Sequence, residues 1–263
     1  MIFLAKILKK LLRKDFFRRN LLVLMDQVVN DEEGRGEIKK IFRQRYVVYY
    51  TEKSRVLSQL CDRFGSDKGT VAFDNHVYNW PAHNYCDYYE SLFHNSRFNT
   101  RKVFECGIGT NNESINSNMT KNGRPGASLR VWKEFFPNAK IYGADVDKSI
   151  LFNEDRIYTD FIDQTSVKSI AQYWNNLNVY GFDLMIDDGL HNFSAGKNLF
   201  EGSIKYLGDL GVYVIEDVTS QNLLLFKEYF DTQKYFVEYI ELFRDVGNSL
   251  GDNSLVVIRK NNL

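Results

Sequence analysis

The chain has 263 residues, and its 34 Lys and Arg balance its 34 Asp and Glu, so the formal net charge is zero. This balance argues against a dedicated nucleic-acid binder, which usually carries a basic excess. Hydrophobic residues make up 44% and charged residues 26%, which suits one large α/β domain with a polar surface. Three cysteines without metal-type spacing predict a reducing, cytoplasmic setting.

The N-terminal segment is basic and amphipathic. Residues 1–20 hold seven Lys and Arg against Asp15 alone, and their apolar residues recur at helical spacing. Charges interrupt any signal-peptide core, and no run reaches the roughly eighteen apolar residues of a transmembrane helix. The pattern fits a helix at the inner face of a membrane, and it also fits a helix packed on the domain or on a second copy of the chain.

Two parts are expected along the chain. Residues 1–60 are predicted to be a helical segment, and residues 61–263 a separate domain that begins with turns and aromatic residues up to residue 100. Beyond residue 100, strands and helices alternate, which predicts a Rossmann-like, doubly wound, mostly parallel seven-stranded sheet with an antiparallel last strand. Strands are expected at 102–110, 140–147, 181–189, 211–218, 235–243 and 254–260, and helices at 128–137, 166–176, 194–207 and 222–230. The stretch 156–163 is interpreted as a turn, and the polar insertion 111–126 is expected over the first glycine loop.

Polar residues follow these strands, and in open α/β sheets ligands bind outside the carboxyl ends of the strands. The loop after the first strand of the second part reads G-I-G-T and lacks the third glycine that packs beneath a pyrophosphate. A ligand with an adenosine but no phosphate is therefore expected, and S-adenosylmethionine is the commonest such cofactor. Asp145, at the end of the next strand, is predicted to hold ribose hydroxyls, with capping of a helix as the alternative.

Acidic residues at two later strand ends predict a cation. Parallel strands lie about 4.8 Å apart, so Asp188 should meet Glu216 or Asp217 if their strands are neighbours. Carboxylates at that density repel unless a divalent metal joins them, and Mg²⁺ prefers such oxygens. His191 is predicted as the general base beside them, with hydrogen bonding to the substrate as the alternative. The pleat allows only one of Asp187 and Asp188 to face the metal, and the other could cap the next helix; Glu216 and Asp217 can both bind it only if their strand has ended.

Several stretches between residues 62 and 218 carry a family resemblance: "FGSDKGT", "HNYCDYYESLF", "FECGIGT", "GASLRVWKEFFPNAKIYGADVD", "FDLMIDDGLH" and "GVYVIEDV". With them the chain resembles class I S-adenosylmethionine-dependent methyltransferases. More narrowly, it resembles the metal-dependent sugar O-methyltransferases of the macrocin O-methyltransferase and cephalosporin hydroxylase-like group. Two departures concern the acceptor pocket: Leu190 stands where the family usually has a small residue, and the insertion 111–126 is long.

The resemblance implies methyl transfer from S-adenosylmethionine to a hydroxyl of a sugar or sugar-like small molecule, and roles for particular residues. The residues implied for the cofactor are Asp67, Lys68, Glu105, Gly107, Gly109, Ser128, Asp145, Asp160, Phe161 and Asp187. Asp188, Glu216 and Asp217 are implied for the metal, and His191 with Asp188 for catalysis. Two alternatives remain: a phosphate-type or other small polar acceptor in surface-polysaccharide biosynthesis, and a non-catalytic cofactor-binding protein with a membrane-surface helix.

Overall fold

The computed structural model describes residues 44–49, 55–70, 78, 80–242 and 251–261. The chain forms two compact units, Met1–Gln44 and Arg45–Leu263. The division into 1–60 and 61–263 stays a prediction. The predicted basic helix at the N-terminus lies outside the described residues. Every helix in the described part is too short or too polar to cross a membrane.

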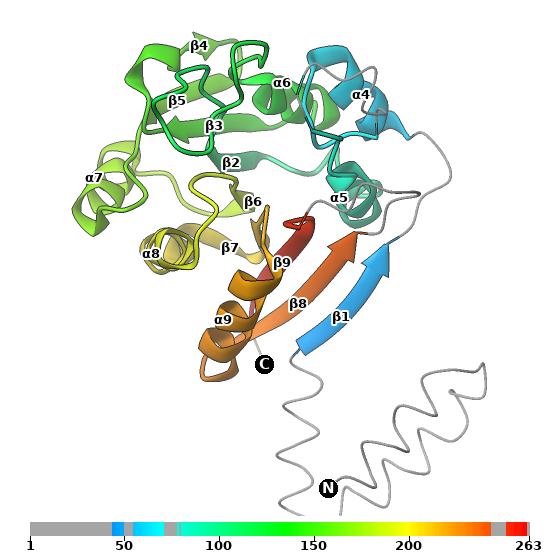
Figure 1. The fold of residues 1–263 in the computed structure, drawn as a ribbon, viewed down its shortest axis with the longest axis vertical. Coiled ribbons are helices and arrows are strands. Elements are labelled where there is room, and N and C mark those ends of the chain that lie inside the picture. Colours follow the sequence, from blue (N-terminus) through cyan, green and yellow to red (C-terminus); the bar gives the residue numbers. More distant parts are fainter. Residues whose placement is uncertain (1–43, 50–54, 71–77, 79, 243–250, 262–263) are drawn as a thin grey trace, which may run out of the picture. The chain divides into compact units, whose positions relative to one another are not determined.

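One sheet runs through the second unit, and Figure 1 shows helices on both of its faces. Its strand order among the described residues is β1-β8-β9-β7-β6-β2-β3-β5-β4. The strands are β1 (Gln44–Tyr49), β2 (Lys102–Cys106), β3 (Lys140–Asp145), β4 (Asn153–Glu154), β5 (Ile157–Phe161), β6 (Phe182–Asp187), β7 (Leu207–Ile215), β8 (Tyr235–Leu242) and β9 (Ser254–Lys260).

The strand directions confirm the predicted Rossmann-like fold. β5, β3, β2, β6 and β7 are parallel to their neighbours in that order, whereas β9 is antiparallel to both β7 and β8. The sheet has nine described strands where seven were expected, because β1 and the two-residue β4 extend its two edges. β1 lies in a stretch that was predicted to be helical. Its sequence QRYVVY is rich in β-branched and aromatic residues, which favour strands.

β5 also departs from the prediction, which treated residues 156–163 as a turn. Ile157 to Phe161 pair in parallel with β3, in the register Ile141 with Ile157 and Asp145 with Phe161. Only Ile157 in this strand is fully buried. A strand whose faces are mostly accessible lacks the continuous apolar run typical of inner parallel strands, which is why its sequence resembles a turn.

Two layers of helices cover the sheet. The described helices are α4 (Val56–Phe64), α5 (Tyr85–Phe93), α6 (Ala127–Phe135), α7 (Val167–Leu177), α8 (Phe193–Ser203) and α9 (Ser220–Asp231), with 3-10 turns at Lys148–Ile150 and Ile204–Tyr206. α4, α5 and α6 share one apolar core with alternate strand residues such as Val103. α7, α8 and α9 share the other core with residues such as Phe104. The period of two along each strand thus divides its side chains between two helical layers.

The predicted helices agree with the structure, and one helix was missed. α5 lies in the region expected to consist of turns, and its sequence YCDYYESLF buries three tyrosines. The N-cap residues that precede α7, α8 and α9 are Ser166, Asn192 and Thr219, and the side chain of each accepts a hydrogen bond from a backbone N–H of the first turn. The cap that precedes α8 is therefore Asn192, and Asp187 does not fill that alternative role.

Candidate active site at the carboxyl ends of the parallel strands

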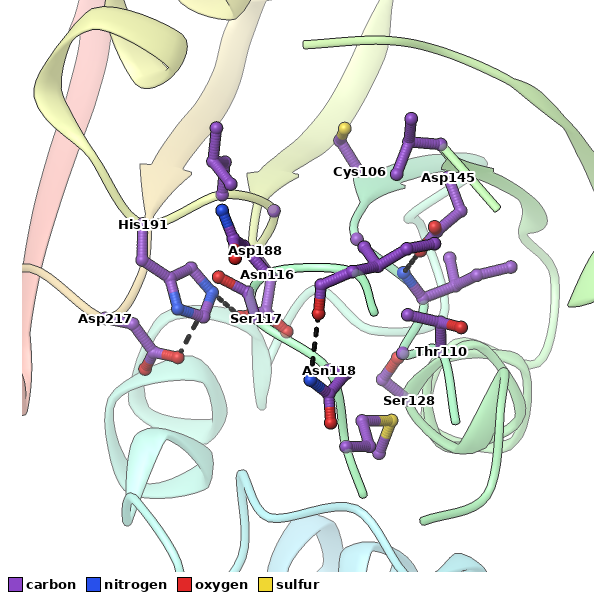
Figure 2. A pocket seen from close by; sticks show the side chains of 18 of the residues that line it. Cys106, Thr110, Asn116, Ser117, Asn118, Ser128, Asp145, Asp188, His191 and Asp217 are labelled. Atoms are coloured by element: carbon purple, nitrogen blue, oxygen red, sulfur yellow. Dashed lines mark hydrogen bonds and ion pairs between the residues drawn. The ribbon is translucent and has the colours of Figure 1, made fainter. Parts of the chain in front are cut away.

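A cavity of about 610 Å³ lies where the parallel strands end. Its floor comes from the loops that follow β2, β3, β6 and β7. Two other segments also line it: the insertion, through residues 115–119, and the stretch 66–68 that follows α4. Figure 2 shows the insertion side chains facing the ends of β6 and β7. The N–H of Met119 in the insertion donates to the carbonyl of Thr110 at 2.7 Å, so the insertion lies against the glycine loop, as expected.

The loop after β2 requires glycine at two positions. Gly107 has a φ of +87°, and a Cβ there would lie 1.9 Å from the backbone oxygen of Asp188. Gly109 has a φ of +83°, and a Cβ there would lie 1.6 Å from the Sδ of Met119. L-residues disfavour this left-handed conformation, and the Asp188 backbone cannot move aside without disturbing β6. Because neither glycine carries a side chain, the backbone of this loop can lie directly beside the cavity.

Asp145 lines the cavity at the end of β3 and is 6% exposed. Its two oxygens accept hydrogen bonds from the backbone N–H groups of Ile108 and Asp147, both at 2.9 Å. Burial raises the pKa of Asp145. The alternative capping role belongs to Asp147, which accepts from the N–H of Ser149 at 2.9 Å and from the hydroxyl of Thr110. Asp145 thus fixes the glycine loop and stays next to the cavity.

Asp160 and Phe161, which the resemblance implies for the cofactor, do not line the cavity. Asp160 is exposed, and its Oδ1 accepts a hydrogen bond from the N–H of Phe161 at 2.7 Å. The ring of Phe161 lies beneath the ammonium of Lys148, 4.4 Å from the ring centre. Residues 162–165, which follow directly after β5, line the cavity in their place. Once 157–161 is recognised as a strand, the strand-end rule points to these residues.

Asp187 supports the cavity from behind. It is buried, and its Oδ1 accepts hydrogen bonds from Gln164 Nε2 at 2.5 Å and from the N–H of Gly189 at 3.3 Å. The Oε1 of Gln164 in turn accepts from the N–H of Leu190 at 2.9 Å. Burial raises the pKa of Asp187 to about 6. Asp187 therefore acts on the cavity through Gln164, whereas Ser128, at the start of α6, lines it directly.

Asp188, His191 and Asp217 form the first of two charged groups. The Nε2 of His191 lies 3.4 Å from Asp188 Oδ1 and 3.3 Å from Asp217 Oδ2, as Figure 2 shows. His191 and Asp217 both have positive φ, 55° and 52°, so the backbone turns sharply where each side chain enters the cavity. Burial acts to lower the pKa of His191, but Asp217 and Asp188 outweigh it and raise that pKa to about 10. The imidazole beside these two carboxylates therefore carries a proton.

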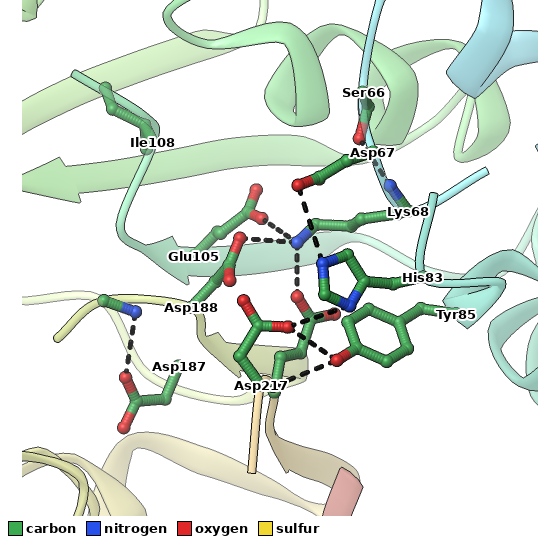
Figure 3. Close-up of polar contacts among 12 residues, drawn as sticks. Ser66, Asp67, Lys68, His83, Tyr85, Glu105, Ile108, Asp187, Asp188 and Asp217 are labelled. Carbon is green, nitrogen blue, oxygen red and sulfur yellow. Dashed lines mark hydrogen bonds and ion pairs between the residues drawn. The ribbon is translucent and has the colours of Figure 1, made fainter. Parts of the chain in front are cut away.

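Lys68 is the centre of the second group, shown in Figure 3. Its side chain is 2% exposed. The ammonium lies 2.6 Å from Asp188 Oδ2 and 3.4 Å from Glu105 Oε1, and it donates a hydrogen bond to Glu216 Oε2. Burial acts to lower the pKa of Lys68, but the carboxylates of Asp188, Glu216 and Glu105 raise it. Burial raises the pKa of Glu105 to about 7. Asp188 itself, between Lys68 and His191, has a pKa lowered to about 2 despite its burial.

The predicted metal set is divided between these two groups. Asp188 and Asp217 line the cavity, whereas Glu216 is 1% exposed and turns toward Lys68. The other oxygen of Glu216 accepts a hydrogen bond from the hydroxyl of Tyr89 at 2.5 Å. β7 ends at Ile215, yet the side chains of Glu216 and Asp217, which follow it, still point to different sides. Glu105, predicted to frame the cofactor, also lies beneath the cavity and not on its wall.

The first charged group fits a divalent metal. One oxygen of Asp188, one oxygen of Asp217 and a ring nitrogen of His191 lie within 4.8 Å of one another. The Nε2 of His191 contacts both carboxylates but makes no well-aligned hydrogen bond to either. Mg²⁺ is commonly held by one or two carboxylates, with water and substrate completing its shell. Asp188 and Asp217 at the cavity wall meet that description.

The sequence did not assign roles to the residues that hold Asp217 in place. The hydroxyl of Tyr85 donates to Asp217 Oδ1 at 2.6 Å, and His83 Nδ1 lies 3.3 Å from the same oxygen. His83, Trp80 and Asp252 also line the cavity. Tyr85 and His83 lie in "HNYCDYYESLF", one of the stretches that carry the family resemblance. A helical interpretation of 85–93 would have indicated which of its tyrosines face the sheet.

No protein-family model matches the chain. Several curated proteins, however, are similar to it in sequence. The mycinamicin VI 2''-O-methyltransferase of Micromonospora griseorubida is 31% identical over 52% of this chain and 32% of its own length. The 8-demethyl-8-alpha-L-rhamnosyl tetracenomycin-C 2'-O-methyltransferase of Streptomyces olivaceus is 28% identical over 66% of this chain and 41% of its own length. The relatives of this chain are sugar O-methyltransferases.

A solved structure supports the same kinship. The MycE methyltransferase from the mycinamycin biosynthetic pathway, in complex with Mg, SAH and mycinamycin VI, superimposes with a TM-score of 0.54 at 26% identity, over 79% of this chain and 55% of its own. The resemblance to sugar O-methyltransferases and the fold predicted from the sequence are thereby confirmed. The chain spans less than half the length of the curated relatives it matches.

Proposed function

We propose that this chain is an S-adenosylmethionine-dependent O-methyltransferase that acts on a hydroxyl group of a sugar or sugar-like small molecule, assisted by a divalent metal. One observation carries the proposal: a single cavity joins the glycine loop and Asp145 to the group formed by Asp188, His191 and Asp217. A cofactor site and an acid–base site therefore share one space. The sugar O-methyltransferase relatives and the MycE complex with Mg and SAH support the same activity.

The cofactor fits the side of the cavity formed by the ends of β2 and β3. Gly107 and Gly109 allow a ligand to approach the backbone closely, and Asp145 offers oxygen atoms that can accept hydrogen bonds from ribose hydroxyls. Ser128 and the residues 162–165 complete this side. A group without phosphates suits it, since the lining among the described residues contains several carboxylates and Lys68 as its one Lys or Arg.

Methyl transfer breaks the bond from carbon to the sulfonium sulfur and forms a bond from carbon to the acceptor oxygen, whose proton must leave. A divalent metal held by Asp188 and Asp217 would lower the pKa of a hydroxyl bound to it. His191 lies 3.3 Å from Asp217 and can receive the proton once it has lost its own. That loss requires the negative charge of the two carboxylates to be offset, because this charge keeps the imidazole protonated.

The acceptor fits the side of the cavity formed by Asp67, Trp80, His83 and the insertion residues 115–119. The indole N–H of Trp80 donates to Asp67 Oδ2 at 2.9 Å, which fixes an aromatic ring beside a carboxylate. An aromatic surface with polar groups nearby suits a sugar, which presents C–H groups on its face and hydroxyls at its edge. A phosphate-type acceptor is disfavoured, because Lys68 is already surrounded by Glu105, Asp188 and Glu216.

Two measurements test this proposal. Calorimetric titration with S-adenosylmethionine and S-adenosylhomocysteine should show binding, and NAD should not bind. Incubation with rhamnosylated and nucleotide-linked sugars should give products heavier by one methyl group, and EDTA should stop their formation. Turnover that persists in excess EDTA would rule out the metal, whereas binding of NAD in place of S-adenosylmethionine would rule out the whole assignment.

We further propose that the basic N-terminal residues 1–20 attach this cytoplasmic enzyme to an anionic membrane surface or to a second copy of the chain. The support is their charge, seven Lys and Arg against Asp15. Sedimentation with vesicles distinguishes the two: attachment to the membrane requires anionic lipid, whereas self-association is seen without vesicles and depends on protein concentration.

A further inference from the structure

His191 enters the cavity from a strained backbone. Its φ is +55°, in the left-handed region that few residues other than glycine adopt. It is the last residue of a short loop that follows β6 and leads to Asn192, the N-cap of α8. Such a conformation persists at a functional site only where the surrounding structure holds it. The contacts that hold this loop therefore decide where the imidazole lies.

The first half of the loop is held by the segments that follow two neighbouring strands. The N–H of Asp188 donates to the carbonyl of Cys106, the last residue of β2, at 2.8 Å. The N–H of Leu190 donates to Gln164 Oε1, after β5, at 2.9 Å. A Cβ at Gly189 would lie 2.3 Å from the same oxygen, so the amide of this glutamine packs directly on the loop. These contacts end one residue before the histidine.

The histidine itself is held by α9. The Nδ2 of Asn222 donates to the backbone carbonyl of His191 at 3.1 Å. Asn222 is the third residue of α9, and its N–H donates to the hydroxyl of the N-cap Thr219 at 3.2 Å, so the start of the helix fixes its place. It lines a small second cavity of about 10 Å³ and does not line the main one. Its described contact with the active site therefore runs through the backbone of His191.

We propose that Asn222 is a positioning residue: by holding the carbonyl of His191, it maintains the left-handed turn that points the imidazole at Asp188 and Asp217. The Nε2 of His191 lies 3.4 Å and 3.3 Å from these two carboxylates. The catalytic role of His191 is taken from the proposed function, and the task of Asn222 goes beyond it. α9 would thus control the catalytic group, although none of its residues is among those that line the main cavity.

The size of the effect follows from the backbone. One ordinary hydrogen bond changes an equilibrium by about 2- to 13-fold, and the left-handed conformation is disfavoured for an L-residue by about 5- to 30-fold. Losing the bond therefore removes a contribution comparable to the strain that it offsets. Leu190 and Asn192 stay fixed by their own hydrogen bonds. We expect the backbone of His191 between them to relax to negative φ in part of the molecules, which turns the imidazole away from the carboxylates.

Asn222→Leu tests this on the full chain, with Gln221→Leu, at the exposed neighbouring position, as the matched control. Leucine has nearly the shape of asparagine without its donor, and it favours a helix more, so α9 itself should not be weakened. The chain has four histidines, and the signals that disappear in His191→Ala identify its imidazole in a ¹⁵N-histidine-labelled sample. Asn222→Leu should shift or split these signals, and Gln221→Leu should leave them unchanged.

Single-turnover methyl transfer measures the consequence for the rate, with methyl α-L-rhamnopyranoside as the acceptor. Asn222→Leu should slow transfer by about 2- to 13-fold and leave the affinity for S-adenosylhomocysteine unchanged. In the His191→Ala background the same substitution should slow transfer no further, because two residues that act through one group are not additive. A merely structural role of Asn222 would lower the rate equally in both backgrounds, together with the melting temperature.

The outcomes separate the task of Asn222 from the proposed function. Unchanged His191 signals in Asn222→Leu would overturn the positioning role while methyl transfer stands, and so would an equal slowing in both backgrounds. If His191→Ala transfers the methyl group at the wild-type rate, or if the wild type methylates no sugar, the proposed function fails, and the His191 signals alone decide whether Asn222 positions the ring. If Asn222→Leu does not fold, Asn222→Ala against Gln221→Ala gives the same comparison.

Discussion

Asp145 and Asp160 lie near the ends of adjacent strands, yet only Asp145 faces the cavity. Asp145→Ala should weaken binding of S-adenosylhomocysteine by about 1.5–3 kcal/mol, the usual contribution of a hydrogen bond to a charged group. Asp160→Ala is the matched control, because this carboxylate is exposed, and it should leave the affinity unchanged. Isothermal titration calorimetry measures both. If both variants lose the same affinity for S-adenosylhomocysteine, Asp145 does not specifically hold the ribose.

His191 is the residue on which the acid–base chemistry depends. His191→Ala should retain binding of S-adenosylhomocysteine and slow methyl transfer by about 10²–10⁴-fold, the usual contribution of a general base. Raising the pH should restore part of the rate, since an alcohol then ionises more readily by itself. His94→Ala, at an exposed histidine of the same chain, should change nothing. Single-turnover rates measured across pH test this, and a variant with the wild-type rate would show that His191 is not the general base.

At the scale of elements, α5 connects the sheet to the charged groups. It directs Tyr85 toward Asp217 and Tyr89 toward Glu216, both with hydroxyls that donate to carboxylates. Tyr89→Phe leaves a buried acceptor of Glu216 without its partner, and such a loss costs about 1–3 kcal/mol. We expect the free energy of unfolding in urea to fall by that amount.

Tyr229→Phe, in α9, is the control for Tyr89→Phe in α5. Its hydroxyl also donates to a carboxylate, that of Glu201 at 3.0 Å, but the pair is exposed to solvent. Water can replace the lost bond, so the free energy of unfolding should change by less than about 0.5 kcal/mol. If the two variants lose the same stability, burial does not explain the role of α5.

At the scale of the whole molecule, the described residues that line the cavity all lie between Ser66 and Asp252. A chain that lacks residues 1–25 should therefore fold and bind S-adenosylhomocysteine with the affinity of the full chain. Only its sedimentation with anionic vesicles, or its self-association, should change. Calorimetry on the truncated chain measures the first expectation, and a folded truncation that has lost the cofactor would show that the first unit contributes to the site.

The sequence by itself determined the fold class, the positions of most helices and strands, and the strand ends that carry Asp145, Asp188, His191 and Asp217. These follow from local patterns: the alternation of strands and helices, and the rule that polar residues after parallel strands meet at one edge. It failed for β1, β5 and α5. β1 and β5 have strand-prone residues but lie at or near the edges of the sheet, without the long apolar run of an inner strand. α5 is dense in tyrosine, and its packing outweighs its weak helix propensity.

Only the tertiary structure decided which charged side chains pair with one another. Lys68 is 120 residues from Asp188 and 148 from Glu216 along the chain, and no local pattern predicts that its ammonium lies between them. Nor does the sequence show that Glu216 and Asp217 face different sides, because that depends on the positive φ of Asp217 and on the tyrosines of α5. Electrostatic attraction depends on the distance in space between two charged groups. The fold sets that distance, and it cannot be read from the order of residues in the chain.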